Sequence, residues 1–151
     1  MAQRGLVAFA VTVAVAVGLG VAGCSSGGGP AEVRQAGTYH GTVTGGHQGT
    51  FKLFIFSNGK VNGKVVLTDI STTFLITGTS SGDPTAPGGA TLSANGNASG
   101  IHLHMDMTIV PGGAGEPKYV ITGTWTTSDG QHGDCGGGWD GPPPSSGGFP
   151  T

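Results

Sequence analysis

The sequence predicts an all-β protein, a small antiparallel up-and-down β-barrel of about seven or eight strands behind an N-terminal signal helix. Three observations indicate this fold class. Glycine makes up 32 of the 151 residues and is scattered, without the every-third-residue repeat of collagen. Thr, Ser and Val are abundant, whereas Glu, Lys and Leu, which favour helices, are scarce. Gly, Asn and Asp separate the short β-branched runs, as is typical of tight turns between strands.

The first half of the domain is expected to form four strands, at residues 38–44, 51–56, 61–68 and 72–79. Asn58-Gly59 predicts a hairpin between the second and third strands, because this pair accepts the positive φ angles of a type I′ turn. The second strand is apolar on both faces, where Phe51, Leu53 and Ile55 alternate with Phe54 and Phe56. One of these two sets must therefore face away from the core.

The second half is expected to contain strands at residues 90–94, 98–110 and 118–127, followed by a Gly-rich, weakly patterned segment that ends at Trp139. Asn95-Gly96-Asn97 predicts the turn between the first two of these strands. Consecutive antiparallel strands with short turns favour a closed barrel, because closure removes exposed strand edges. A two-sheet β-sandwich is the alternative fold.

Two Gly-Thr-aromatic units occur in the expected strands, Gly37-Thr38-Tyr39 and Gly123-Thr124-Trp125. They resemble the strand signatures of the calycin barrels, the lipocalin and avidin types. Tyr39 stands where a lipocalin has its early Trp. The resemblance covers a few residues of each strand and implies a small β-barrel, a fold that does not by itself imply a function.

The first 24 residues have the pattern of an export signal. Arg4 precedes an uncharged, largely apolar run over residues 5–23, and the run ends in Val21-Ala22-Gly23-Cys24. This ending resembles the lipobox of bacterial lipoprotein precursors. The resemblance implies that the signal is cleaved between Gly23 and Cys24 and that Cys24 carries a diacylglyceryl group, with a further acyl chain such as palmitate on the new amine.

The lipobox implies an exported protein, attached by its lipid to the extracytoplasmic side of the cell membrane or envelope. Two or three acyl chains hold a protein stably on a membrane, whereas one chain holds it only marginally. An uncleaved transmembrane helix is the alternative interpretation of the same apolar run. The glycines at positions 18, 20 and 23 and the lack of a basic residue directly after Cys24 argue against that helix.

The composition divides the chain into four segments. Residues 1–23 form the expected signal peptide, residues 24–36 a flexible Gly/Ser tether, residues 37–141 the β-barrel domain, and residues 142–151 a disordered Pro/Gly tail. The formal net charge is −2, and it becomes −3 without the signal peptide, which contributes Arg4 and no acid. Nucleic acid is therefore not an expected partner, because its phosphates require clustered Lys and Arg.

His102, His104 and Asp106 are the candidate metal ligands of the chain. They alternate with apolar residues in the longest expected strand, so their side chains share one face, and His-x-His is a spacing that metal sites use on strands. A further ligand could come from His40 or His47 on another strand. The favoured interpretation is the solvent-facing side of an amphipathic strand, so no metal and no other cofactor is expected.

Cys135 has no partner within the chain if Cys24 carries a lipid. We expect it to be buried and reduced, or paired between two molecules. The sequence contains no Gly-x-Ser-x-Gly, no phosphate-binding loop and no pair of acidic residues in a catalytic arrangement, so an enzyme is not expected.

Two functions remain as expectations. The first is a binding module that holds a small apolar ligand, with the aromatic side chains either lining a cavity or filling the barrel. The second is a structural or interaction protein without a ligand cavity. It would dock an envelope protein, or a second copy of itself, through the face that carries Phe54 and Phe56.

Overall fold

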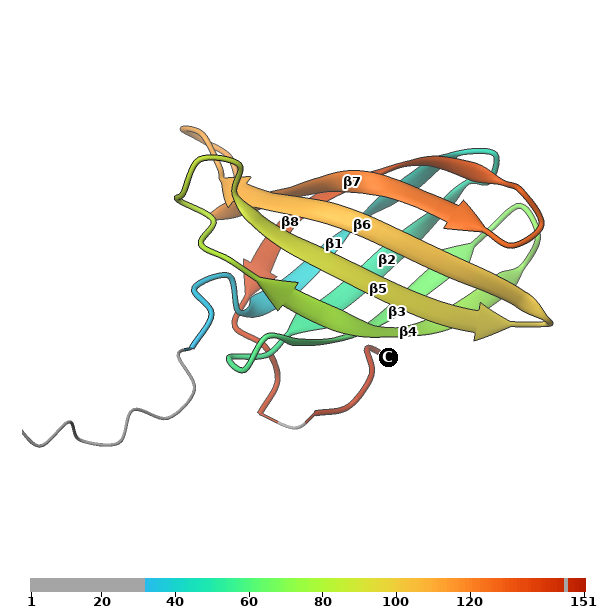
Figure 1. Cartoon of the computed structure of the whole chain (residues 1–151), viewed down its shortest axis with the longest axis horizontal. Helices are drawn as coiled ribbons and strands as arrows, with labels where there is room; N and C mark the ends of the chain where they lie inside the picture. Colours follow the sequence, from blue (N-terminus) through green and yellow to red (C-terminus); the bar gives the residue numbers. More distant parts are fainter. Residues whose placement is uncertain (1–31, 146) are drawn as a thin grey trace, which may run out of the picture.

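The computed structural model describes residues 32–145 and 147–151, and eight antiparallel strands within them form a closed barrel (Figure 1). Each strand pairs with the next, and the last strand pairs with the first. The strands are β1 (Gly37–Gly45), β2 (Gly49–Ile55), β3 (Lys60–Leu67), β4 (Thr72–Ser81), β5 (Ala90–Ala98), β6 (Ile101–Pro111), β7 (Tyr119–Thr127) and β8 (His132–Gly141). This arrangement confirms the up-and-down barrel and differs from the sandwich alternative.

The signal peptide and lipobox, residues 1–24, lie outside the described residues. No helix in the described part of the chain is long and apolar enough to span a membrane.

The β2–β3 hairpin is present, but its turn is not of the expected type. A type I′ turn needs two residues with positive φ, whereas Gly59 has a φ of 79° and Asn58 is not in the positive region. The backbone N–H of Gly59 donates to the carbonyl of Phe56, and that of Phe56 donates to the carbonyl of Lys60. The loop therefore has three residues, with a single left-handed position that glycine occupies at no steric cost.

The β5–β6 turn also differs from the expectation. Asn95-Gly96-Asn97 does not turn but continues β5, where these residues pair with β4 and β6. The turn lies at Ser99-Gly100, where both φ angles are positive, at 51° and 79°. Gly96 remains in the strand because its missing side chain makes room for Ile76, whose Cγ2 would lie 2.5 Å from a Cβ at this position.

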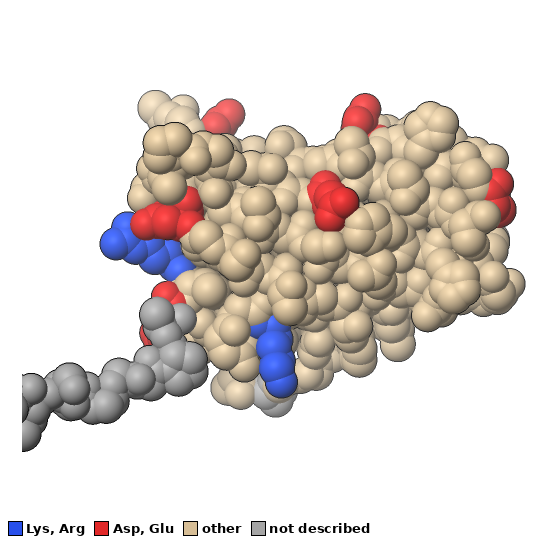
Figure 2. All heavy atoms as spheres, in the orientation of Figure 1, with Lys and Arg blue, Asp and Glu red and all other residues tan. Residues whose placement is uncertain are grey.

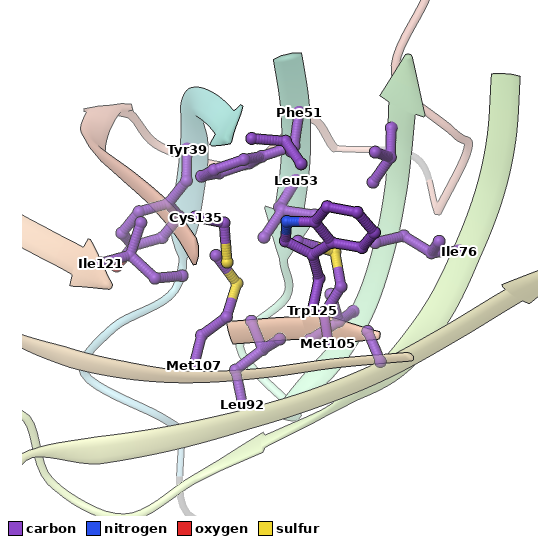
Figure 3. Close-up of a cluster of buried hydrophobic side chains, with 14 of the residues drawn as sticks. Tyr39, Phe51, Leu53, Ile76, Leu92, Met105, Met107, Ile121, Trp125 and Cys135 are labelled. Carbon is purple, nitrogen blue, oxygen red and sulfur yellow. The ribbon is translucent and has the colours of Figure 1, made fainter. Parts of the chain in front are cut away.

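Alternate residues of every strand point into the barrel and form one hydrophobic core. An eight-stranded barrel has an interior that side chains can just fill. Figure 3 shows that the side chains from different strands meet there in one cluster, which includes Tyr39, Phe51, Met105, Met107 and Trp125. The aromatic residues of the interior therefore pack against one another and against aliphatic side chains.

Polar contacts cover both ends of this core. At one end Gln35 is fully buried, its side-chain Nε2 donates to Ser80 Oγ at 3.0 Å, and its backbone carbonyl accepts from the Tyr39 hydroxyl at 2.8 Å. Burial raises the pKa of Tyr39, so its phenol stays neutral and can donate. At the other end His47 stacks on Trp125 with ring centroids 6.0 Å apart, and Trp125 Nε1 donates to the Thr44 carbonyl at 3.0 Å.

The barrel is complete within the described residues. Every strand edge is paired, and the core and the side chains packed on it lie between Val33 and Trp139. The chain from Ser25 onward therefore contains all of the contacts that hold the barrel together.

Glycines form the seam at which β8 closes on β1. Gly41 and Gly137 lie directly opposite each other. A Cβ on Gly137 would overlap the His40 carbonyl oxygen, and a Cβ on Gly41 would overlap the Gly136 carbonyl oxygen. Both strands can approach this closely only because neither residue has a side chain.

We predict that Gly137→Ala destabilises the barrel by about 1–3 kcal/mol, because the new methyl group must push the two backbones apart. Gly136→Ala is the matched control, since its Cβ would find no atom closer than 3.8 Å. Its stability should be unchanged or higher by up to about 1 kcal/mol. Urea unfolding of the chain from Ser25 onward measures both free energies. Equal values for the two variants would contradict the close approach at the seam.

Candidate functional site

A groove of about 610 Å³ runs over the outer surface of β8, β1, β2 and β3. These strands lie at the back of the view in Figure 1. The volume is in the range of small-molecule sites, roughly 300–1,000 Å³. Pro117, from the β6–β7 connection, borders one side. The other lining residues are His40, Gly41, Thr42, Thr50, Phe51, Lys52, Lys64, Val66, Gly136, Gly137 and Gly138.

The floor of the groove is exposed backbone. Strand β8 contributes Gly136-Gly137-Gly138, so nothing fills the space between the side chains of β1 and Pro117. A Cβ on Gly138 would lie 2.6 Å from Cγ of Pro117, which packs over that residue. The Gly-rich segment that shows little strand pattern in the sequence is therefore β8, the strand that forms the floor of the groove. Its lining is mostly apolar.

Three basic side chains cross the groove in one row. His40 on β1 lies opposite Lys52 on β2, and Lys52 lies opposite Lys64 on β3. His40 has a carboxylate partner, with its Nδ1 2.5 Å from Asp140 Oδ2. Lys52 and Lys64 are half-buried, and within the described residues no carboxylate lies within 4.0 Å of either amine. Like charges directly opposite each other on neighbouring strands are destabilising, so this pair is a cost to the isolated barrel.

The three candidate metal ligands share the outer face of β6, as their alternation predicts. His104 Nε2 lies 2.9 Å from Asp106 Oδ2, while His104 Nδ1 lies 2.7 Å from Asn95 Oδ1. The hydrogen bond from His104, with a second from Ser93, lowers the pKa of Asp106. His102 does not join this cluster. Its backbone is held by Ser128 instead: the His102 N–H donates to Ser128 Oγ at 3.0 Å, and the His102 carbonyl accepts from the Ser128 N–H at 2.9 Å.

The expected third ligand does not reach this strand. His40 pairs with Asp140 on β8, and His47 pairs with Asp69 in the β3–β4 turn at 2.7 Å. That hydrogen bond is the main reason why the pKa of Asp69 is lowered. Over residues 32–145 and 147–151, no group of three or more His, Cys, Asp or Glu is arranged to hold a metal ion.

Phe54 on β2 and Phe56 just after it face outward, so Phe51, Leu53 and Ile55 are the set that enters the core. The two outward rings are half-buried and meet edge to face, with centroids 6.5 Å apart. Asn62, opposite Phe54 on β3, donates through Nδ2 to the Gly147 carbonyl at 2.6 Å. The C-terminal segment of the chain therefore contacts this face of the barrel.

Cys135 lies in the core, with 5% of its surface exposed and with Met107 beside it (Figure 3). It is a free thiol in the described structure. Burial, with a smaller contribution from the Asp134 charge, raises the pKa of Cys135 to about 12. The thiol is therefore protonated at neutral pH and is not a nucleophile in the folded protein.

Comparison with known proteins adds no relative to this geometry. No protein-family model matches the chain, and the searches of curated proteins and of solved structures also find no match.

We predict that Cys135 resists alkylation as long as the barrel is folded. In the chain from Ser25 onward it is the sole cysteine, so mass spectrometry after iodoacetamide treatment at pH 8 reports on it alone. Modification of the folded protein should be at least about 100-fold slower than in 6 M guanidinium chloride, because the thiolate is rare and buried. Similar rates in the two conditions would contradict the burial of this thiol.

Proposed function

We propose that the protein is a lipid-anchored lipoprotein of the cell envelope whose barrel binds a small apolar ligand. The observation that carries the binding role is the groove over β8, β1, β2 and β3, which combines a mostly apolar lining with a volume of about 610 Å³. Core side chains occupy the interior, so the groove is a better ligand site than the barrel axis.

The membrane attachment rests on the lipobox at residues 21–24. The segment that follows it reaches the barrel beside the β2–β3 turn, where the Val33 N–H donates to the Ser57 carbonyl at 2.8 Å. A chain tethered at this point would hold the groove strands close to the membrane surface. Apolar ligands are most abundant there, which fits the proposed role.

The geometry favours this role over the interaction protein. A docked partner or second copy would use the face of Phe54 and Phe56, and Asn62 on that face already binds the chain's own C-terminal segment at Gly147. The groove is free of such a contact within the described residues.

We predict that Cys24 carries the lipid. Expression of the whole chain in a bacterium fed an alkyne-tagged fatty acid should label the protein and place it in the membrane fraction. Cys24→Ser should lose the label, while Cys135→Ser, which removes the core thiol, should keep it. A labelled Cys24→Ser protein, or an unlabelled parent chain, would contradict the anchor.

We predict that filling the groove weakens ligand binding. The probe is 1-decanol, a neutral apolar molecule, titrated into the ¹⁵N-labelled chain from Ser25 onward while the amide signals of the three β8 glycines are followed. Gly136→Leu should weaken binding at least about tenfold, because the new side chain occupies the groove without meeting the backbone.

Thr124→Leu is the control for this experiment. It adds the same side chain to an exposed position of β7 that does not line the groove, so binding should match that of the parent chain. Thermal unfolding verifies that both variants are folded. The proposal is wrong if 1-decanol leaves the glycine signals of the parent chain unchanged.

A further inference from the structure

Lys52 and Lys64 are neighbouring cations on the outer face of β2 and β3. Among the Lys and Arg residues that the structure describes, Arg34 alone has a carboxylate partner, Asp83 at 3.2 Å, and Lys52 and Lys64 are the two lysines that lie directly opposite each other in the sheet. The two lysines face each other without a carboxylate, although the chain has 8 acidic residues against 6 basic ones and a net charge of −2. An anion placed between them would remove their repulsion.

No carboxylate is among the residues that line the groove. Asp106 is on the outer face of β6, Asp69 is in the β3–β4 turn and Asp129 is in the β7–β8 turn. Figure 2 views the barrel from the side of β4 to β7 and shows acidic side chains on that face. Asp140, on β8, bonds His40 and lies within 4.0 Å of neither lysine. The positive charge in the groove is therefore left for a ligand.

The groove is also polar at one side and apolar at the other. The lysines stand on β2 and β3, while β8 contributes only glycine backbone, and Pro117 borders that side. Lys52 Nζ lies over the Phe54 ring, 5.9 Å from its centroid, which is a weak cation–π contact and leaves the three N–H donors of the amine without a carboxylate acceptor within 4.0 Å. A molecule that fills this groove would place a charged group at β2 and β3 and a hydrocarbon part along β1 and β8.

From this arrangement we infer that the ligand is a single-chain anionic amphiphile, whose carboxylate or phosphate is bound between Lys52 and Lys64 and whose alkyl chain lies along the glycines of β8. The inference rests on the proposed function, because it names the ligand class of the same groove. The volume of about 610 Å³ suits one alkyl chain with a small head group.

The test compares three probes that share one alkyl chain: decanoate, decyl phosphate and neutral 1-decanol, each below its micelle concentration at pH 7.5. Titrations of the chain from Ser25 onward are followed by the glycine amide signals of β8 and by calorimetry. Decanoate and decyl phosphate should bind at least about tenfold more tightly than 1-decanol, because their charged groups meet the lysine pair.

The variants Lys52→Gln and Lys64→Gln should each lower the affinity for decanoate at least about tenfold and leave the affinity for 1-decanol unchanged. Lys60→Gln removes the same charge at the exposed start of β3, outside the groove, and should change neither affinity. Because the net charge is equal in all three variants, a difference among them reports the position of the lysines and not long-range attraction.

The outcomes separate the two proposals. Equal affinities for decanoate and 1-decanol, or an equal loss in Lys60→Gln, would overturn the anionic ligand and leave the apolar groove intact. Absence of binding by every probe would overturn both. The whole chain in phosphatidylcholine vesicles should give the same preference for decanoate. If Lys52→Gln and Lys64→Gln instead weaken only sedimentation with phosphatidylglycerol vesicles, the pair binds a membrane surface and the inference is wrong.

Discussion

The close approach of β8 to β1 is the constraint on which the rest of the structure depends. Closure leaves no strand edge exposed, and it requires two backbones to come together at Gly41 and Gly137, where a methyl group would strike a carbonyl oxygen. The Phe51 ring fills the space that Gly41 leaves on the inner side, since its Cζ lies 2.6 Å from where a Cβ would stand. The interior is thus packed at the seam although two of its residues have no side chains.

The same glycine-rich strand gives the barrel its groove. Gly137 serves closure on the inner side, whereas Gly136 and Gly138 leave the outer side without side chains. A strand of ordinary composition would close the barrel equally well with a residue such as Thr at position 136, because its Cβ would meet no atom within 3.8 Å. Closure therefore explains Gly41 and Gly137 but not Gly136, and the groove is the feature that Gly136 makes possible.

Alternation of apolar residues was sufficient to predict the barrel and most of its strands, because the core takes one face of each strand. It could not define β8, where glycines carry no hydropathy pattern, and it misplaced the β5–β6 turn, because Gly96 serves packing against Ile76. The lysine pair depended on the turn between β2 and β3. A two-residue turn at Asn58-Gly59 would set Lys52 opposite Val65, whereas the observed three-residue loop shifts the register by one and sets it opposite Lys64.

The length of the β2–β3 loop, three residues instead of two, therefore decides whether two lysines face each other in the groove. The register that buries Phe51, Leu53 and Ile55 also fixes Lys52 and Lys64 on the outer side, so the core holds the pair in place against its own repulsion. Moving either lysine by one position along its strand would bury it, and replacing either by Thr would relieve the repulsion without disturbing the core. The fold accommodates the pair but does not require it, so the proposed anion gives the pair a role that the core does not.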